Sequence, residues 1–498
     1  MMNNYSKRIA NGYSVATSLA LLSMSVLVMP AYGLESEVQS FFHGDWEVTC
    51  DNTHTCRAVG YHNPEQKNTA GEYSPVSVIF TRAAGENAKV KGRVKFGALS
   101  FDGEDKHAGN NTITLSINDT YQSVLLPELP SYEQKGIRFN GDRQLTDNQV
   151  SELLKALTMK GRVSIKFDSN TGDEWYLSTK GSTAVLLKMD DYQGLVETPF
   201  AIVKKGQVSK GIVQPKQVPV ISIPDQPIPV TTAADLALAT DADFNQRIRT
   251  ALNNACDNVP VEDQPLELEL ARLTSNKLVV STMCWSAAYN YGQAVWLVDD
   301  DAEIEPVLVT DSAVSYVNGV IDEFMRGRGV GDCLSARRYI WNGSEFVLAD
   351  SYTTGACREI APGGAWYIPT MVSTVINGID PAAGIDCESE QAYSTQGMVK
   401  CAQRELAGLE WQMSEQLAEI ERFSHAGYNT KADKAREAAA AIGQAQQAWR
   451  IFRKSECNAQ QLSAAEGSLS LSIFVGCQLE LTKQRIQQLL SDKQTFMY

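Results

Sequence analysis

The sequence contains few histidines and none of the common catalytic motifs. Five histidines occur in 498 residues, namely His43, His54, His62, His107 and His425, and none lies between residues 108 and 424. Histidine is the most frequent general base in enzymes, so this interval holds no Ser-His or Cys-His pair of its own. The patterns G-x-S-x-G, H-E-x-x-H and the phosphate-binding P-loop are also missing. We therefore predict no catalytic residue, no cofactor and no enzyme activity. A pair of carboxylates needs no motif and is the alternative that leaves glycosidase-like chemistry open.

Long apolar runs are absent after the first 33 residues. Two basic residues, Lys7 and Arg8, precede an apolar run over residues 15–29, and small residues follow it. This order is typical of a cleaved secretory signal peptide, predicted here over residues 1–33. The run is short and interrupted by serine, which disfavours the alternative of an uncleaved membrane anchor. We expect an exported protein with no membrane anchor after signal cleavage.

An excess of basic residues is absent as well. The formal net charge is −15 and the sequence pI is near 5.0, which argues against binding to nucleic acid. The acidity is uneven: residues 387–498 carry a net charge of −1 and residues 1–33 carry +2, so residues 34–386 carry −16. This charge either steers a basic partner toward the protein or keeps the protein soluble.

Cysteines, in contrast, are plentiful and even in number. Because the chain is predicted to be exported, they are expected to form structural disulfides. The economical pairs are Cys50–Cys56, Cys256–Cys284 and Cys333–Cys357, each of which closes a short loop and contributes about 2–4 kcal/mol. The pairing of the last four is left open. The ten residues are Cys50, Cys56, Cys256, Cys284, Cys333, Cys357, Cys387, Cys401, Cys457 and Cys477.

The length predicts about three domains after the signal peptide. A stretch with five prolines over residues 211–232 lacks any amphipathic period and predicts an extended linker. A second break is predicted over residues 376–386. We therefore expect a multidomain protein with two β-rich α+β domains followed by a disulfide-stapled three-helix bundle. The three domains are predicted over residues 34–210, 233–375 and 387–498.

The first predicted domain is rich in alternating strands and carries two helices. Strands are expected around "WEVTC", "CRAVGY", "SVIFTRA", "AKVKGRVKFG", "TITLSIND" and "GRVSIKFD", with a tight turn at Asn52-Thr53-His54. Thr146 and Gln149 have the spacing of a capping box, and Ser182 is expected to cap the second helix.

The second predicted domain offers several weak binding patterns. Asp241, Asp243 and Asn245 imitate the start of a calcium loop, but the loop's glycine and final glutamate are missing, so a helix N-cap is preferred. Glycines in "RGRGVGDC" could form an anion-binding nest, although a turn beside Cys333 is preferred. The acidic run over residues 299–305 is interpreted as a solvated loop. A zinc site at Cys50, His54 and Cys56 lacks a fourth ligand, so no metal site is predicted.

The third predicted domain has apolar residues spaced by three and four, which is typical of helices packed in a bundle. One stripe comprises Met398, Ala402, Leu406, Leu409, Met413, Leu417 and Ile420. The second, after a capping box at Thr430 and Asp433, comprises Ala435, Ala438, Ile442, Ala445, Trp449 and Phe452. A third helix is expected from about residue 469 to 490. On this pattern Trp449 and Phe452 lie in the core, Arg450, Arg453 and Lys454 form a solvated basic face, and all four cysteines gather at one end.

The same residues carry a resemblance to a known family. The order Cys387, Cys401, "QAWRIFRKSEC" ending at Cys457, "GSL", Cys477, Thr482 and Arg485 resembles the N-terminal domain of the LprI lysozyme-inhibitor family, with Trp449 and Arg453 among the motif residues. Members of that family often carry Leu-Asn and then Tyr in the first helix, where this chain reads "LEWQMSE". Residues 34–375 resemble an exported family of Gram-negative bacteria known only as a domain of unknown function, through "DWEVTCDN", "LLKMDDYQG" and "GRGVGDC".

The first resemblance implies inhibition of lysozyme, or of another peptidoglycan hydrolase, by occupation of the enzyme's saccharide cleft. The predicted signal peptide and the second resemblance together predict a periplasmic location in a Gram-negative cell. Two alternatives stand beside it: a non-catalytic scaffold or interaction protein of the envelope, and a carboxylate-dependent enzyme without a recognisable motif. A shared family does not fix a function, so the three are kept as separate hypotheses.

Overall fold

The computed structural model describes residues 39–497 except 66, 69–70, 72, 98–111, 135–136, 209, 257–265, 427–431 and 464–468. Side chains are also left undescribed at 133–134, 137–138, 423, 425–426, 432–433 and 494–497. The predicted signal peptide, His107, the side chain of His425 and the predicted capping box at Thr430 and Asp433 therefore lie outside the described part.

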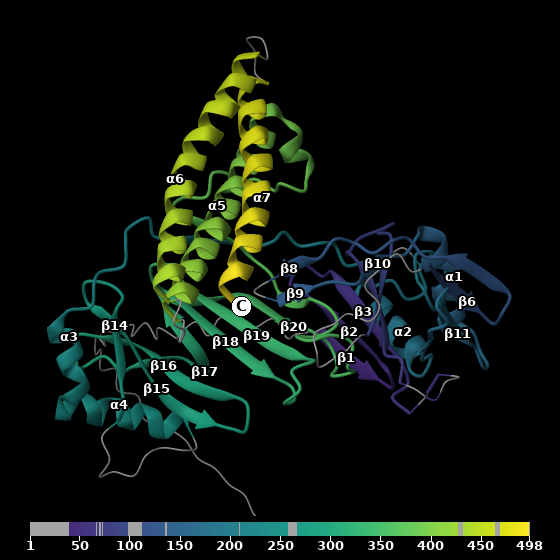
Figure 1. The fold of residues 1–498 in the computed structure, drawn as a ribbon, viewed down its shortest axis with the longest axis horizontal. Coiled ribbons are helices and arrows are strands. Elements are labelled where there is room, and N and C mark those ends of the chain that lie inside the picture. The colour runs from purple at the N-terminus through teal and green to yellow at the C-terminus, as the bar shows by residue number, and fades with distance from the viewer. Residues whose placement is uncertain are drawn as a thin grey trace, which may run out of the picture. The chain divides into compact units, whose positions relative to one another are not determined.

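The first β-rich segment contains two antiparallel sheets (Figure 1). The larger has the order β1 (Gln39–His43), β2 (Trp46–Cys50), β3 (Cys56–Tyr61), β4 (Val76–Arg82), β5 (Lys91–Phe96) and β10 (Asp142–Gln144). The smaller has the order β12 (Glu174–Leu177), β11 (Ile165–Ser169), β6 (Ile113–Ile117) and β7 (Tyr121–Val124), and β8 (Tyr132–Gln134) pairs with β9 (Ile137–Phe139). Alternating apolar residues of both sheets, including Trp46, Phe80, Phe167 and Trp175, form one buried core.

Two helices cover this core. α1 (Asp147–Thr158) begins with the predicted capping box, in which the Thr146 side chain accepts from the Gln149 backbone N–H and the Gln149 side chain accepts from the Thr146 N–H. α2 (Ser182–Tyr192) departs from the prediction: its N-cap is Gly181, and Ser182 is its first helical residue. The Ser182 hydroxyl donates instead to the Leu157 and Thr179 carbonyls. Ser182 thus ties α2 to α1.

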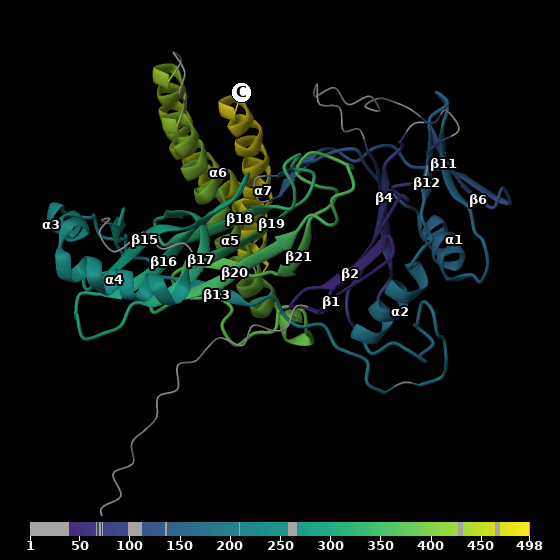
Figure 2. The ribbon, with the colours of Figure 1, turned by 90° about the horizontal axis from the view of Figure 1, so that it is seen from below.

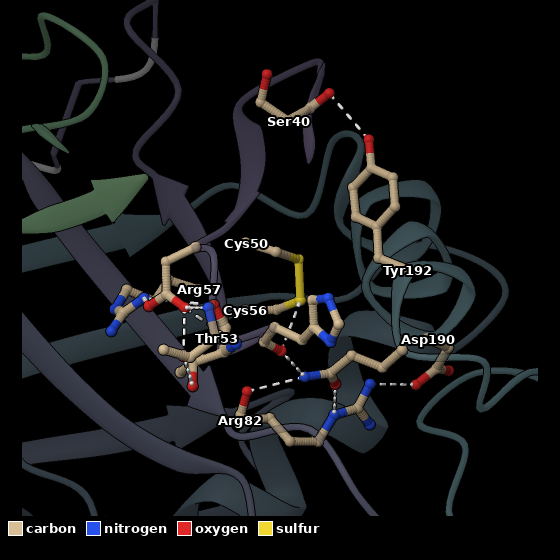
Figure 3. Close-up of a disulfide and its surroundings, with 12 residues drawn as sticks. Ser40, Cys50, Thr53, Cys56, Arg57, Arg82, Asp190 and Tyr192 are labelled. Carbon is tan, nitrogen blue, oxygen red and sulfur yellow. Dashed lines mark hydrogen bonds and ion pairs between the residues drawn. A yellow bond between two sulfur atoms is a disulfide. The ribbon is translucent and has the colours of Figure 1, made fainter. Parts of the chain in front are cut away.

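The predicted hairpin between β2 and β3 is closed by the Cys50–Cys56 disulfide (Figure 3). His54 in its turn has a positive φ of 66°, a conformation that a tight turn requires. Beside it, Arg82 of β4 and Asp190 of α2 form an ion pair of 2.8 Å in which both side chains are buried. Asp190 also accepts from the backbone N–H groups of Ile202 and Val203, so the buried carboxylate is fully paired.

The second β-rich segment is an eight-stranded antiparallel meander. Its strands are β14 (Glu269–Arg272), β15 (Lys277–Ser286), β16 (Tyr291–Asp299), β17 (Val307–Val317), β18 (Val320–Arg326), β19 (Leu334–Trp341), β20 (Phe346–Thr353) and β21 (Ile368–Met371). Two helices, α3 (Ala233–Ala237) and α4 (Ala242–Ala255), precede it, and α4 lies along β15 and β16 in both views (Figures 1 and 2). The Asp241 side chain caps α4 by accepting from the Phe244 N–H, which confirms the predicted helix N-cap at this position.

The two β-rich segments share a hydrophobic cluster. Val59, Tyr61 and Ile79 of the first pack with Ile360, Trp366 and Ile368 of the second, and all six are buried. The Trp366 indole N–H donates to the Ser77 hydroxyl at 2.8 Å. Asn52 exchanges two hydrogen bonds with the Val372 backbone, of 3.0 and 2.8 Å. The domain boundaries at 210 and 233 stay predictions, but the two segments are in direct contact.

Both predicted linkers border a small parallel sheet. β13 (Val220–Ile223) lies inside the proline-rich stretch and pairs with β22 (Thr374–Asn377), which runs into the second predicted break. Its residues precede Pro224, whose missing N–H is tolerated at the end of an edge strand. This pairing brings the end of the meander beside the start of the second segment.

The C-terminal segment is helical, as predicted. A short η2 (Glu390–Tyr393) precedes the long helices α5 (Thr395–Ala426), α6 (Ala432–Ser463) and α7 (Ser470–Met497), which lie side by side in Figure 1. α7 continues seven residues beyond the predicted end. Met413, Ile420, Ile486 and Leu489 form the buried centre of the bundle. The architecture is therefore the predicted one: β-rich segments followed by a disulfide-stapled helical bundle.

Candidate functional site

The interior of the bundle contains a polar cluster around Arg453. The Arg453 guanidinium donates from Nη1 to the Thr482 hydroxyl and from Nη2 to the Glu410 carboxylate, both at 2.6 Å. It also stacks 5.0 Å from the ring centre of Trp449. The Thr482 hydroxyl in turn donates a hydrogen bond to the Gln478 carbonyl at 2.7 Å. One cation thus connects all three helices of the bundle.

A second polar contact lies one to two turns away. Arg485 donates from Nε to the Gln446 side-chain oxygen at 2.9 Å, and the Gln446 amide donates to the Met413 sulfur at 3.1 Å. Gln446 is buried, like Arg453. The four family-motif residues Trp449, Arg453, Thr482 and Arg485 therefore belong to contacts between helices, and their contribution to binding a partner stays a prediction.

These contacts correct the predicted stripe on the second helix. Phe452 was expected in the core but is 52% exposed, and Arg453 was expected on a solvated face but is only 8% exposed. The face of α6 that packs inward instead follows Ile442, Gln446, Trp449, Arg453 and Cys457, of which Ile442 and Trp449 are partly buried and the other three are buried. An apolar pattern misses this face because two of its members are polar and are paired inside the bundle. The five residues of this face are spaced by four, three, four and four, which is a helical spacing and was the signal present in the sequence.

Two disulfides lie at the end of the bundle where α5 and α7 begin and α6 ends. They join Cys387 to Cys401 and Cys457 to Cys477. The other three disulfides, Cys50–Cys56, Cys256–Cys284 and Cys333–Cys357, are the pairs that the sequence predicted. At the Cys333 staple, a Cβ on Gly327 would come within 2.6 Å of the Cys333 sulfur, so the turn requires glycine.

The α6–α7 side of this end exposes several apolar side chains, which we call the α6–α7 apolar set. Leu462 is 86% exposed, the highest value among them. Ile451 and Leu462 lie eleven residues apart, close to three helical turns, so they point to the same side of α6. The full set is Ile451, Phe452, Leu462, Leu469 and Leu471. Extended apolar surface commonly marks a site that binds another protein, so the α6–α7 apolar set is a candidate contact surface.

α5 is the helix that attaches the bundle to the β-rich part. Its Trp411 is 7% exposed and packs with Ile340, Ala349 and Val375 of the meander and its neighbouring strand. A Cβ on Gly408 would lie 2.8 Å from the Thr374 methyl, so glycine allows this helix to approach β22 closely. Trp411 stands in "LEWQMSE", the stretch where the chain departs from the lysozyme-inhibitor pattern. The departure therefore coincides with a contact to the chain's own β-rich part.

Two ion pairs accompany this attachment. Arg404 of α5 binds Asp380, and Arg338 of β19 lies 3.7 Å from Glu415 of α5 and 2.6 Å from Asp322. Burial raises the pKa of the Glu415 carboxyl, and the charge of Arg338 opposes that rise. Sequence reasoning did not find these pairs because their members lie far apart in the chain.

One cavity of the meander brings three carboxylates together. A cavity of about 290 Å³ on β17–β20 contains Asp322, Glu323 and Asp350. Asp322 binds Arg338, Glu323 accepts from the Thr310 hydroxyl, and Asp350 accepts from the Tyr367 hydroxyl at 3.0 Å. Each of the three carboxylates in this cavity thus has a partner within the protein.

One group of potential metal ligands occurs in the described residues, at Asp332, Cys333 and Cys357. Its two sulfur atoms are joined to each other, and Asp332 is held by Arg328 at 2.6 Å. The zinc alternative at Cys50 and Cys56 is likewise closed by their disulfide. Where described, the glycines of "RGRGVGDC" form turns, with the Gly331 N–H donating to the Arg328 carbonyl at 3.0 Å.

The fold and its five disulfides define a multidomain protein built to work outside the cytoplasm, with a β-rich body and a stapled helical bundle. The family described as "Protein of unknown function (DUF1176)" matches residues 40–373, and the chain belongs to this family. The family described as "Lysozyme inhibitor LprI" matches residues 387–489, which covers the bundle.

A curated relative is similar over part of the chain. The chain is 22% identical over 359 residues to "Uncharacterized protein YpfG" of Escherichia coli (strain K12), which covers 66% of this chain and 90% of that protein. No solved structure matches the chain. In the described part of the chain, no helix is long and apolar enough to cross a membrane.

Proposed function

We propose that the protein is a periplasmic, non-catalytic inhibitor of lysozyme or of a related peptidoglycan hydrolase, and that its bundle makes the contact. The observation that carries this proposal is the division of the bundle surface. α5 is occupied by the β-rich part through Trp411, Arg404 and Glu415, while α6 and α7 leave the α6–α7 apolar set exposed. The family match over residues 387–489 supports lysozyme as the class of partner.

Rigidity of the surface supports the proposal. The Cys457–Cys477 disulfide fixes the end of α6 to the start of α7, and the Arg453 cluster fixes both to α5. A surface that is ordered before binding avoids a cost of about 0.5–1.5 kcal/mol for each side chain immobilised on contact. The motif residues thus act by holding the surface, and the exposed apolar side chains make contact with the enzyme's saccharide cleft.

The charge distribution supports a second role for the β-rich part. Residues 34–386 carry the acidity of the chain, whereas the bundle is almost neutral. Many lysozymes are basic, so the acidic part raises the rate of encounter and the bundle supplies the affinity. Encounter would then slow as salt increases, while the dissociation rate changes little.

The test is inhibition of lysozyme by the oxidised, full-length protein in a turbidity assay with a peptidoglycan suspension. We expect inhibition of at least one of several lysozymes, and loss of it after reduction of the disulfides. Leu462→Asp should weaken inhibition by about tenfold or more, because it places a charge in an apolar contact. Val230→Asp is the matched control, since Val230 is also 86% exposed but lies outside the bundle.

A scaffold function is the second candidate, favoured by the interior position of Arg453 and Thr482. If the folded, oxidised protein inhibits none of the lysozymes, the inhibitor proposal is wrong and the scaffold function takes its place. If Leu462→Asp and Val230→Asp both inhibit like the parent protein, inhibition does not use the α6–α7 apolar set.

A further inference from the structure

A separate cavity of about 440 Å³ lies where the two β-rich segments meet. The first segment contributes His62, Pro64, Tyr73 and Pro75, and the second contributes Arg328, Cys357, Arg358 and Glu359. This volume is within the range of sites for small molecules. The wall therefore combines an apolar side, made by two prolines and a tyrosine, with a charged side.

His62 gives this cavity an unpaired nitrogen. His62 directly follows β3, its backbone forms a bridge with Leu177 of β12, and the residue is only 7% exposed. Its backbone N–H donates to the Val76 carbonyl at 2.9 Å, but its ring Nδ1 is buried without a hydrogen-bond partner in the described part of the chain. Buried polar atoms are normally paired, so a residue that lines a cavity and keeps an unpaired imidazole nitrogen is a candidate for contact with a ligand.

Charges of both signs surround the cavity. Arg358 binds Asp45 at 3.0 Å, and Arg328 binds Asp332 at 2.6 Å and Glu359 at 3.2 Å. Lys67 lies 5.2 Å from the ring centre of Tyr73. Two arginines thus pair with three carboxylates, and Lys67 adds a third cation, so the surroundings of the cavity contain both signs in equal number.

Charges of both signs act on His62. Burial lowers the pKa of the His62 imidazole and the charge of Arg358 lowers it further, while the charges of Asp45 and Glu359 oppose this shift. A lowered pKa favours the neutral imidazole. Glu359, which is exposed, provides the negative side and has a positive φ of 57°, an uncommon backbone conformation for a residue of this type.

We propose that this cavity binds a free amino acid with an apolar side chain. The ligand's carboxylate lies between Arg358 and His62, its ammonium group faces Glu359, and its side chain packs on Pro64, Tyr73 and Pro75. A bare anion meets the repulsion of Glu359 and a bare cation that of Arg358, whereas a zwitterion satisfies both. Site and ligand are then each close to neutral overall.

Calorimetric titration of the full-length, oxidised protein tests the ligand class with four probes of similar shape. Phenylalanine is the zwitterion, N-acetylphenylalanine the anion, phenylalaninamide the cation and alanyl-phenylalanine the peptide. We expect saturable binding of phenylalanine, with each of the other three weaker by about tenfold or more because one charge is missing or displaced. Equal affinity for all four, or no saturable binding of phenylalanine, overturns the proposal. Preference for the dipeptide would assign the site to peptide ends and would also overturn it.

Two variants separate the charged groups. Glu359→Gln should raise the affinity for N-acetylphenylalanine toward that of phenylalanine, because the negative side is neutralised. Glu345→Gln, at an exposed position outside the cavity, should leave the preference unchanged. An unchanged preference in Glu359→Gln excludes the proposed orientation.

An independent readout is the titration of His62 by NMR, assigned with His62→Gln. A carboxylate bound against Arg358 offsets that positive charge, so phenylalanine should raise the pKa of His62, and inorganic phosphate should not saturate the effect. His43, which is exposed on β1, serves as the internal control. Binding without any change at His62 places the ligand elsewhere.

Discussion

Arg404 and Asp380 form a two-point ion pair that fastens the helical bundle to the segment before it. Arg404 Nε lies 2.9 Å from one carboxylate oxygen of Asp380 and Nη2 lies 2.7 Å from the other, while Nη2 also donates to the Ala382 carbonyl. Asp380 belongs to the stretch predicted as a linker over residues 376–386. A fork of two parallel hydrogen bonds fixes direction as well as distance. The start of α5 therefore has a defined position on its neighbour.

Arg404→Ala should lower the free energy of unfolding by about 2 kcal/mol, because it leaves a carboxylate of limited exposure without its charged donors. Urea unfolding followed by fluorescence measures the change. Lys483→Ala is the control: the Lys483–Glu405 pair spans 2.7 Å, but both side chains are about half exposed, so a change under about 0.5 kcal/mol is expected. Equal effects of the two variants would contradict an anchoring role for Arg404.

Trp411→Ala should lower the free energy of unfolding by about 3–5 kcal/mol, because it leaves a cavity in a buried contact between α5 and the meander. The loss should appear together with faster proteolysis within α5, because the bundle is released from the β-rich part. Phe452→Ala removes a ring that is 52% exposed and should change stability little. If Phe452→Ala proves as destabilising as Trp411→Ala, the corrected orientation of α6 is wrong.

Glu47 should make stability depend on pH. Burial raises the pKa of the Glu47 carboxyl, and hydrogen bonds from the Tyr61 hydroxyl and the Ala356 N–H oppose the rise without cancelling it. A carboxyl whose folded pKa is raised stabilises the fold fully below its unfolded pKa of about 4.3 and loses this contribution as pH rises through the folded pKa.

Glu47→Gln imitates the protonated form, so its stability relative to the parent protein should increase from pH 4 to pH 7. Denaturant unfolding at several pH values gives this difference directly. Glu345→Gln, at an exposed position, should show a constant difference over the same range. A difference for Glu47→Gln that falls with pH would show that the hydrogen bonds outweigh burial.

Much of the fold was predictable because its signals are local. The capping box at Thr146, the N-cap at Asp241, the hairpin at Cys50 and the helical periods near residue 420 each depend on residues within a few positions of one another. The predicted N-cap at Ser182 was wrong by one residue. Serine is a good N-cap by type, but the neighbouring Gly181 adopts a φ of 97° and is itself the N-cap of α2.

The candidate sites depend on contacts that no local pattern encodes. Trp366 reaches Ser77 across 289 residues, and Asn52 reaches Val372 across 320. His62 and Arg358, which face one cavity, lie in different β-rich segments. Arg453 is the intermediate case, because its helical spacing from Trp449 and Cys457 was visible, but its charge assigned it to the wrong face.

Limited proteolysis should cut in the proline-rich stretch of residues 211–232 first, as an extended segment offers exposed backbone. We expect the two fragments to remain associated, since the cluster around Trp366 and the pairing of β13 with β22 join their parts. Gel filtration of the digest under native and denaturing conditions measures this. Separation of the fragments under native conditions would mean that the shared cluster does not hold the segments together.

Arg453→Ala should destabilise the protein by about 2 kcal/mol, because the buried Thr482 hydroxyl loses a charged donor, whereas the half-exposed Glu410 carboxylate can be hydrated instead. Arg453→Lys should recover only part of this loss, since an ammonium group cannot reach both partners and stack on Trp449 at once. The free energy of unfolding of Arg450→Ala, on the exposed face one turn away, should differ from that of the parent protein by less than about 0.5 kcal/mol.

The Arg453 variant also separates a structural role of the family motif from a role in contact with lysozyme. If Arg453 only holds the bundle, the variant should inhibit lysozyme normally at temperatures well below its unfolding transition. Loss of inhibition in a protein that circular dichroism shows to be fully folded would make Arg453 a contact residue, and the interior position of its side chain would then have to change on binding.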